Sequence, residues 1–130
     1  MSLSVVLDAS ALLAALQNEQ GGDVVNELVL NPENKVVMSA LNWSEVFDRL
    51  LRSGISEEIV AEMLDALELE IMDFNQEQAR MAASCRMLAP ALSLADRACL
   101  VLAKTRRIEA WTMDKVWQRL NIGVRVKVLR

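Results

Sequence analysis

The fold of this chain is decided by the stretch Val5-Val6-Leu7-Asp8-Ala9-Ser10. Its first residues are uninterruptedly apolar, which is typical of a short strand buried on both faces of a sheet. Asp8 ends that strand where an Ala- and Leu-rich helical pattern, residues 11–16, begins. In an open parallel sheet, ligands bind outside the carboxyl ends of the strands. We therefore expect Asp8 to lie at a ligand-binding edge.

The rest of the chain alternates apolar strand patterns with amphipathic helical patterns. Strands are predicted at residues 5–7, 36–38, 68–74, 108–112 and 124–128. Helices are predicted at residues 9–18, 24–30, 41–52, 56–67, 75–88, 93–105 and 116–120. We expect Ile71 to point inward from its strand and Met87 to belong to the last turn of its helix. This alternation predicts an α/β fold, with a central, mostly parallel five-stranded sheet between two helical layers.

Length and composition limit the class of protein. A chain of 130 residues with 53% apolar residues is expected to form a single domain over residues 1–130. Its uninterrupted apolar runs, such as residues 98–103, are far shorter than the roughly 20 residues that a membrane span needs. The first 16 residues have no positive start and contain Asp8, so they do not resemble a signal peptide. We therefore expect a soluble protein of the cytoplasm.

The absence of histidine excludes several kinds of catalysis. The chain contains no His, so Ser-His-Asp triads, Cys-His nucleophiles, His-pair ribonuclease chemistry and HExxH zinc sites are all excluded. Cys85 and Cys99 lack metal-ligand or redox spacing and are expected to be small, buried apolar residues in helices. A net charge of −4 also excludes a general basic coat for nucleic acid. Catalysis would have to rest on carboxylates, basic groups, hydroxyls, thiols or hard metal ions.

Acidic residues stand where strands end or helices begin. Asp8 ends the first strand, Glu45 lies in the first turns of the helix after the second strand, and Asp96 lies in the first turn of helix 93–105. Asp114 follows the fourth strand by two residues. Because such positions in a parallel sheet face one edge, we expect these acids to converge. Clustered carboxylates repel one another unless a cation lies among them, and Mg²⁺ or Mn²⁺ is the hard, oxygen-binding choice.

Each acid also has a structural explanation. Asp8 has the position of a helix N-cap, and residues 42–45 and 93–96 both have capping-box spacing. Glu45 also stands one helical turn before Arg49, with which it can pair. Asp114 can simply turn the chain. Taken one at a time, these explanations are the simpler ones, and only the convergence of the acids favours a metal site.

The sequence motifs around these acids resemble a known family. They are Val5 to Leu13 (VVLDASALL), Trp43 to Val46 (WSEV), Ser93 to Lys104 (SLADRACLVLAK) and Thr112 to Trp117 (TMDKVW). In order and spacing they resemble the acidic motifs of PIN-domain ribonucleases, and VapC-type toxins of bacterial toxin–antitoxin pairs most of all. The resemblance covers essentially the whole chain, and the last two motifs are the most specific.

This resemblance implies a fold, a site and an activity. It implies a three-layer α/β/α PIN-like domain with the first strand central, and a homodimer that cuts RNA using Mg²⁺ or Mn²⁺. An antitoxin would wrap the toxin and block its site. The metal-binding catalytic acids would be Asp8, Glu45, Asp96 and Asp114. Ser10 and Thr112 match the hydroxyl positions that accompany the first and fourth motifs.

Basic and aromatic residues near the motifs are candidates for contacts with RNA. The basic ones are Arg49, Arg52, Arg97 and Lys115. They are better explained as solvated charges or as weak surface ion pairs. The aromatic ones are Trp43, Trp111 and Trp117. These could stack on RNA bases, but each lies in an apolar segment and is better explained as core or interface.

Three other functions are alternatives to the ribonuclease. A haloacid-dehalogenase-like phosphatase needs an acid two residues after Asp8, where this chain has Ser10. A receiver-like phosphoacceptor needs an early acid pair that is missing. A PIN-fold module that binds RNA or protein without cutting remains the serious alternative. Because all of the acids are present, the sequence itself gives no sign of an inactive site.

Overall fold

The computed structural model describes residues 2–130 of the chain, which contain an all-parallel five-stranded sheet. Its strands are β1 (Ser4–Leu7), β2 (Lys35–Ser39), β3 (Glu70–Met72), β4 (Glu109–Thr112) and β5 (Val126–Val128). They are arranged in the order β3-β2-β1-β4-β5, so β1 is central. The predicted fold class and the central place of the first strand are therefore confirmed.

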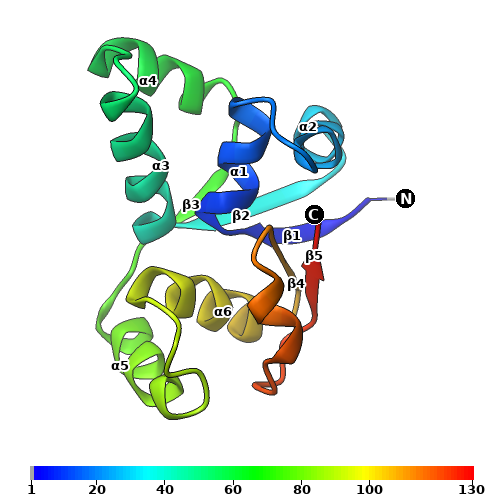
Figure 1. Ribbon diagram of the computed structural model, residues 1–130, viewed down its shortest axis with the longest axis vertical. Coiled ribbons are helices and arrows are strands. Elements are labelled where there is room, and N and C mark those ends of the chain that lie inside the picture. The colour runs from blue at the N-terminus through cyan, green and yellow to red at the C-terminus, as the bar shows by residue number, and fades with distance from the viewer. Residues whose placement is uncertain (1) are drawn as a thin grey trace.

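Helices cover both faces of this sheet. They are α1 (Ala9–Leu16), α2 (Gly22–Leu30), α3 (Ala40–Arg52), α4 (Glu57–Asp65), α5 (Gln76–Ser84) and α6 (Leu94–Arg106). Short 3-10 helices, η1 (Cys85–Met87) and η2 (Lys115–Arg119), follow α5 and β4. Figure 1 shows α1 to α4 on one side of the strands and α5 and α6 on the other. None of these helices is both long and apolar enough to cross a membrane.

The central strand explains why the layers form. Val5 and Leu7 belong to the apolar core beneath α1 to α4, whereas Val6 belongs to the core beneath α6. Side chains that alternate between two apolar layers require an uninterrupted apolar strand, which is what the sequence provides. Helix α6 is apolar around most of its circumference, and residues 98–103 of this helix are accordingly all buried. Trp111 and Trp117 are buried as well, which confirms their place in the core.

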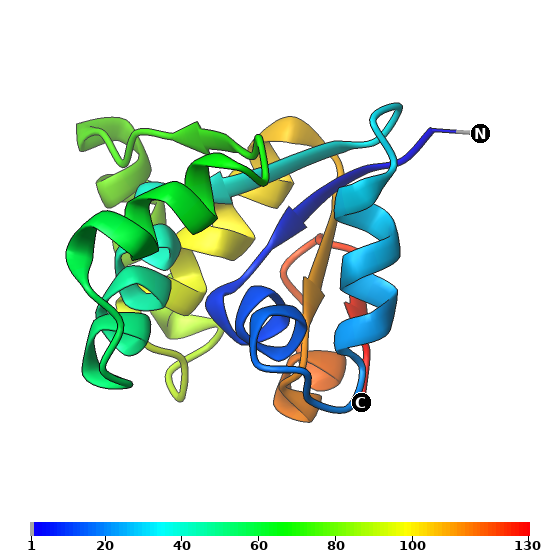
Figure 2. The same cartoon turned by 90° about the horizontal axis from the view of Figure 1, so that it is seen from above.

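The register of the parallel strands places Asp8 and Thr112 side by side. Leu7 of β1 pairs with Trp111 of β4, so Asp8, just after β1, and Thr112, the last residue of β4, lie at the same edge of the sheet. The backbone N–H of Asp8 donates to the carbonyl oxygen of Trp111 at 3.2 Å. In Figure 2, the arrows of β1 and β4 point toward the same end of the molecule, where α1 and η2 begin.

Ile71 and Met87 do not have the surroundings that the sequence predicts. Ile71, predicted to point inward, is 38% exposed. It lies on β3, a strand of three residues at the edge of the sheet, where neither apolar core includes it. Met87 is 87% exposed, because α5 ends at Ser84 and the chain continues as η1. The last strand is also shorter than predicted, since β5 begins only at Val126.

Candidate active site

Asp8 is the most deeply buried acid of the site. It is 3% exposed and is the N-cap of α1, where its Oδ1 accepts the backbone N–H of Ala11 at 2.8 Å. The hydroxyl of Ser10 donates to Oδ1 and Oδ2 at 2.8 and 2.9 Å, and the hydroxyl of Thr112 donates to Oδ2 at 2.5 Å. With these donors on both oxygens, the carboxylate is held in one orientation.

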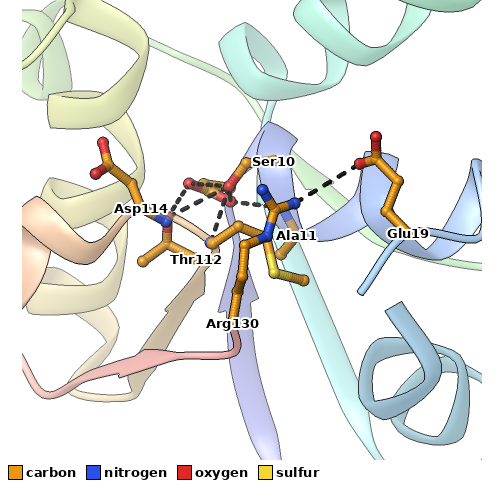
Figure 3. Close-up of polar contacts among 8 residues, drawn as sticks. Ser10, Ala11, Glu19, Thr112, Asp114 and Arg130 are labelled. Atoms are coloured by element: carbon orange, nitrogen blue, oxygen red, sulfur yellow. Dashed lines mark hydrogen bonds and ion pairs between the residues drawn. The ribbon is translucent and has the colours of Figure 1, made fainter. Parts of the chain in front are cut away.

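The two hydroxyls connect Asp8 to the segment that carries Asp114. The Ser10 hydroxyl accepts the backbone N–H of Met113, and the Thr112 hydroxyl accepts that of Asp114, both at 3.0 Å. Each hydroxyl that accepts an N–H directs its own proton to Asp8. Figure 3 shows this network, with Asp114 beside Thr112. The position of Asp114 therefore depends on the carboxylate of Asp8 through hydrogen bonds.

Burial dominates the electrostatics of Asp8. The pKa of Asp8 is raised from 3.8 to about 6, mainly because burial disfavours the ionised carboxylate and in smaller part because of the charge of Asp96. The hydrogen bonds from Thr112, Ala11 and Ser10 act in the opposite direction, because they stabilise the ionised form. A cation at this edge would stabilise the ionised carboxylate in the same way.

Asp96 and Glu45 approach Asp8 from two different helices. Asp96 forms a capping box at the start of α6: its backbone N–H donates to Ser93 Oγ at 3.1 Å, and its Oδ2 accepts the Ser93 N–H at 3.2 Å. Glu45 is exposed on α3, yet partial desolvation and then the charge of Asp96 raise the pKa of its carboxyl. The charge of Asp96 therefore acts on both Asp8 and Glu45, which is consistent with three acids near the same edge of the sheet.

The capping box predicted at residues 42–45 is wrong. Helix α3 begins at Ala40 with Ser39 as its N-cap, so Asn42 lies within the helix. Asn42 is fully buried, and its Nδ2 donates to the backbone oxygen of Ala95 at 3.2 Å and to Glu45 Oε1 at 3.4 Å. Asn42 thus ties α3 to the start of α6 and orients Glu45. Capping-box spacing gives no sign of this role, although Asn42 shares the inward face of α3 with Val46.

The remaining candidate acid, Asp114, and the thiol of Cys99 have different surroundings. Asp114 is exposed and caps η2, since its Oδ1 accepts the backbone N–H of Val116 at 3.0 Å. Cys99 is fully buried on α6, as expected, whereas Cys85, also expected to be buried, is only partly buried at the start of η1. Desolvation raises the pKa of the Cys99 thiol, and the charges of Asp8, Asp96 and Glu45 raise it further. The thiol therefore lies within the field of the same three acids.

The donor set suits a hard cation, but its side chains are spread apart. Asp8, Glu45, Asp96 and Asp114 offer carboxylate oxygens, the ligands that Mg²⁺ and Mn²⁺ prefer. Within residues 2–130, no group of three or more His, Cys, Asp or Glu side chains is close enough to hold an ion as it stands. Asp8 is fixed, whereas Glu45 and Asp114 are exposed. A metal would therefore gather exposed carboxylates around a fixed one.

The basic residues proposed to contact RNA have different surroundings. Arg49 lines a groove together with Ser10 and Asp114. Arg52 pairs with Asp48 one helical turn away, at 2.9 Å. The other two candidates are Arg97 and Lys115. Arg97 donates to the backbone oxygen of Ala82 at 2.7 Å and so joins α6 to α5, whereas Lys115 is exposed beside Asp114.

Burial of Asp8 leads to a testable dependence of stability on pH. Because the pKa of Asp8 is about 6 in the folded protein, the folded state binds a proton there more tightly than the unfolded chain does. The free energy of unfolding should therefore fall by about 3 kcal/mol between about pH 4 and pH 6 and then level off. Urea unfolding in EDTA would measure this as the difference between the wild type and Asp8→Asn.

The matched control for this measurement is Asp65→Asn, which removes an exposed carboxylate at the end of α4. It should retain the pH dependence of the wild type. If Asp8→Asn retains that dependence too, the burial of Asp8 does not destabilise its ionised form.

Comparison with known proteins identifies the family. The model of the PIN-domain family matches residues 5–123. The chain belongs to the PIN-domain family. No curated protein is significantly similar in sequence to this PIN domain. Its family membership therefore rests on the family model, and its fold is also seen in solved structures.

Several of these structures contain toxins with their antitoxins. VapBC2 of Rickettsia felis, bound to a promoter DNA fragment, matches with a TM-score of 0.75 and 16% identity over 98% of this chain and 100% of that one. A toxin–antitoxin complex of Klebsiella pneumoniae matches with a TM-score of 0.74 and 20% identity over 97% and 98%. VapC20 of Mycobacterium tuberculosis, a toxin that cleaves the sarcin–ricin loop, matches with a TM-score of 0.71 and 15% identity over 93% and 98%. These likenesses establish a shared fold.

Proposed function

We propose that this PIN domain is a metal-dependent endoribonuclease that hydrolyses RNA phosphodiester bonds, and that it is the VapC-type toxin of a toxin–antitoxin pair. The observation that supports the proposal is the effect of the Asp96 charge on both Asp8 and Glu45 at the carboxyl edge of the sheet. Asp114 is held at the same edge through Thr112. A chain without histidine can hydrolyse phosphodiesters with such a set of acids if it holds hard cations.

The chemistry is divided between the metal and the protein. Mg²⁺ or Mn²⁺ would be held by Asp8, Glu45, Asp96 and Asp114, and would supply activated water and stabilise the leaving oxygen. The protein's own contribution is to fix Asp8 by the hydroxyls of Ser10 and Thr112. The hydrogen bonds also favour the ionised form of Asp8, which is the form that binds a cation.

Partners follow from the same proposal. Structures of similar fold contain toxins bound to antitoxins, which supports an antitoxin as the partner of this chain. A homodimer and action on cellular RNA in the cytoplasm also belong to the proposal. Arg49, Arg52, Arg97 and Lys115 remain the predicted basic contacts around the site, and Arg49 is the best placed because it shares a groove with Ser10 and Asp114.

The test is cleavage of total cellular RNA by the purified protein. Discrete products should form with Mn²⁺ or Mg²⁺, disappear with EDTA and return when the metal is restored, because the carboxylates alone do not activate water. Gel analysis of the RNA measures this directly. Restoration by zinc alone would contradict the assignment of a hard metal. Intact RNA in every sample, with the metal still bound, would instead favour a PIN module that binds without cutting.

A further inference from the structure

A groove of about 350 Å³ opens beside the acids. Its lining includes Ser10 and Asp114 of the proposed catalytic edge, together with Glu19, Arg49 and Arg130. The two arginines come from segments far apart in the sequence, α3 and the residues after β5. The groove therefore places two guanidinium groups in the same wall as Ser10 and Asp114 of the proposed catalytic edge.

Backbone hydrogen bonds place Arg130 at this groove. The N–H of Leu129 donates to the carbonyl oxygen of Thr112 at 3.0 Å, so the chain runs beside β4 until Arg130 begins. Figure 3 shows the Arg130 side chain reaching past Ser10 toward Glu19. Its Nη2 lies 3.7 Å from Glu19 Oε1. The guanidinium is therefore held next to the acids by a single carboxylate.

The turn after α1 places Glu19 opposite Arg130. The N–H of Glu19 donates to the carbonyl oxygen of Ala14 at 2.8 Å, which closes the turn. Gly21 follows with φ of +89°, and a Cβ there would lie 2.6 Å from the carbonyl oxygen of Leu129. Only glycine allows this backbone conformation and this close approach without strain. The turn and the end of β5 are therefore packed together, and this packing brings Glu19 to Arg130.

The ion pair between Glu19 and Arg130 is easily exchanged. Its side chains are 49% and 42% exposed and meet at 3.7 Å, and such surface pairs contribute little to stability. A phosphate group accepts two parallel hydrogen bonds from a guanidinium, which makes it a stronger partner than this carboxylate. Among the described residues, no carboxylate pairs with Arg49, so that second guanidinium is available to an anion.

We propose that this groove binds a backbone phosphate of the RNA next to the bond that is cut, and that the phosphate replaces Glu19 as the partner of Arg130. Arg49 supplies the second positive charge. The inference rests on the proposed ribonuclease function and assigns a binding subsite to it. It also explains how a chain of net charge −4 holds a polyanion beside an acidic site. Glu19 then acts as a competitor of the substrate.

Substitutions of Arg130 and Glu19 should therefore change the affinity for RNA in opposite directions. The probe is a short, fluorescein-labelled, single-stranded RNA of random sequence, bound in EDTA at low salt so that no cleavage occurs. Arg130→Gln should weaken binding about three- to tenfold and reduce the slope of log K against log salt by about 0.7. Glu19→Gln should tighten binding about two- to fivefold, because Arg130 is then unpaired. Fluorescence anisotropy measures both effects.

The double variant and a matched ion pair serve as controls. Glu19→Gln combined with Arg130→Gln should bind as weakly as Arg130→Gln alone, because Glu19 acts only through Arg130. Glu77→Gln and Arg80→Gln alter an exposed ion pair of α5, outside the groove, and should change binding much less. Under cleavage conditions, Arg130→Gln should raise KM and leave kcat nearly unchanged.

Several outcomes would overturn the inference. It fails if the wild type does not bind the probe, or if Arg130→Gln binds with wild-type affinity and salt dependence. It also fails if Glu19→Gln tightens binding equally in the Arg130→Gln background, since the effect would then be one of net charge. The ribonuclease proposal is tested separately by cleavage. If that proposal is wrong, the wild type leaves RNA intact with Mn²⁺, whatever the binding assay shows.

Discussion

Asp96→Asn is expected to abolish metal-dependent RNA cleavage without destabilising the protein. The substitution removes a carboxylate whose charge acts on both Asp8 and Glu45. Loss of one such group from the site should lower kcat at least roughly a hundredfold. The asparagine side chain keeps an oxygen that can accept the Ser93 N–H, so the capping box at the start of α6 can still form. The free energy of unfolding in EDTA should therefore stay the same or rise.

The matched control is Asp23→Asn, which removes an exposed acid from the first turn of α2. It should leave cleavage unchanged, and urea unfolding in EDTA compares the stability of the three proteins. A loss of about 2 kcal/mol or more in Asp96→Asn would show that Asp96 acts mainly as a cap. Full cleavage activity in Asp96→Asn would show that Asp96 does not belong to the catalytic site.

Thr112→Val should damage both the fold and the activity. Thr112 is fully buried, donates to Asp8 and accepts the N–H of Asp114. Valine has nearly the same shape but no hydroxyl, so it leaves a buried carboxylate oxygen without one of its donors. We expect a loss of about 1–3 kcal/mol in the free energy of unfolding. Cleavage should fall about 10- to 100-fold, as when an outer partner of a metal ligand is removed.

A pH profile separates this positioning role from a purely structural one. Because the Thr112 hydroxyl lowers the pKa of Asp8, its removal should move the acid limb of the profile to higher pH. Thr112→Ser keeps the hydroxyl and should retain the wild-type profile and most of the activity. An unchanged acid limb in Thr112→Val would show that the hydroxyl does not tune Asp8.

The central strand and its acid were predictable because local pattern and global fold agree there. An uninterrupted apolar run followed by Asp8 and a helical pattern has few alternatives to a buried parallel strand. The start of α6 was predictable for a similar reason, since Ser93 and Asp96 have capping-box spacing and form that box. In both places the residues that define the element also carry the candidate chemistry.

Other features depend on tertiary contacts that spacing does not reveal. Asn42 has the spacing of a cap, but Ser39 starts the helix earlier and Asn42 becomes a buried link to α6. Likewise, nothing in the sequence joins Glu19 to Arg130, because their approach depends on how the turn at Gly21 packs against β5. The exposure of Ile71 was missed because pattern alone does not show that β3 is an edge strand.

The chemistry of the RNA ends is the most direct test of metal-assisted hydrolysis at this carboxylate site. Purified protein should act on total cellular RNA with Mn²⁺, beside EDTA and Asp96→Asn controls, and the ends should be identified by sequencing. Attack by water breaks the bond to the 3′ oxygen, so the account predicts 5′-phosphate and 3′-hydroxyl ends that are absent from both controls. Products with 2′,3′-cyclic phosphate ends, or cleavage that persists in Asp96→Asn, would contradict it.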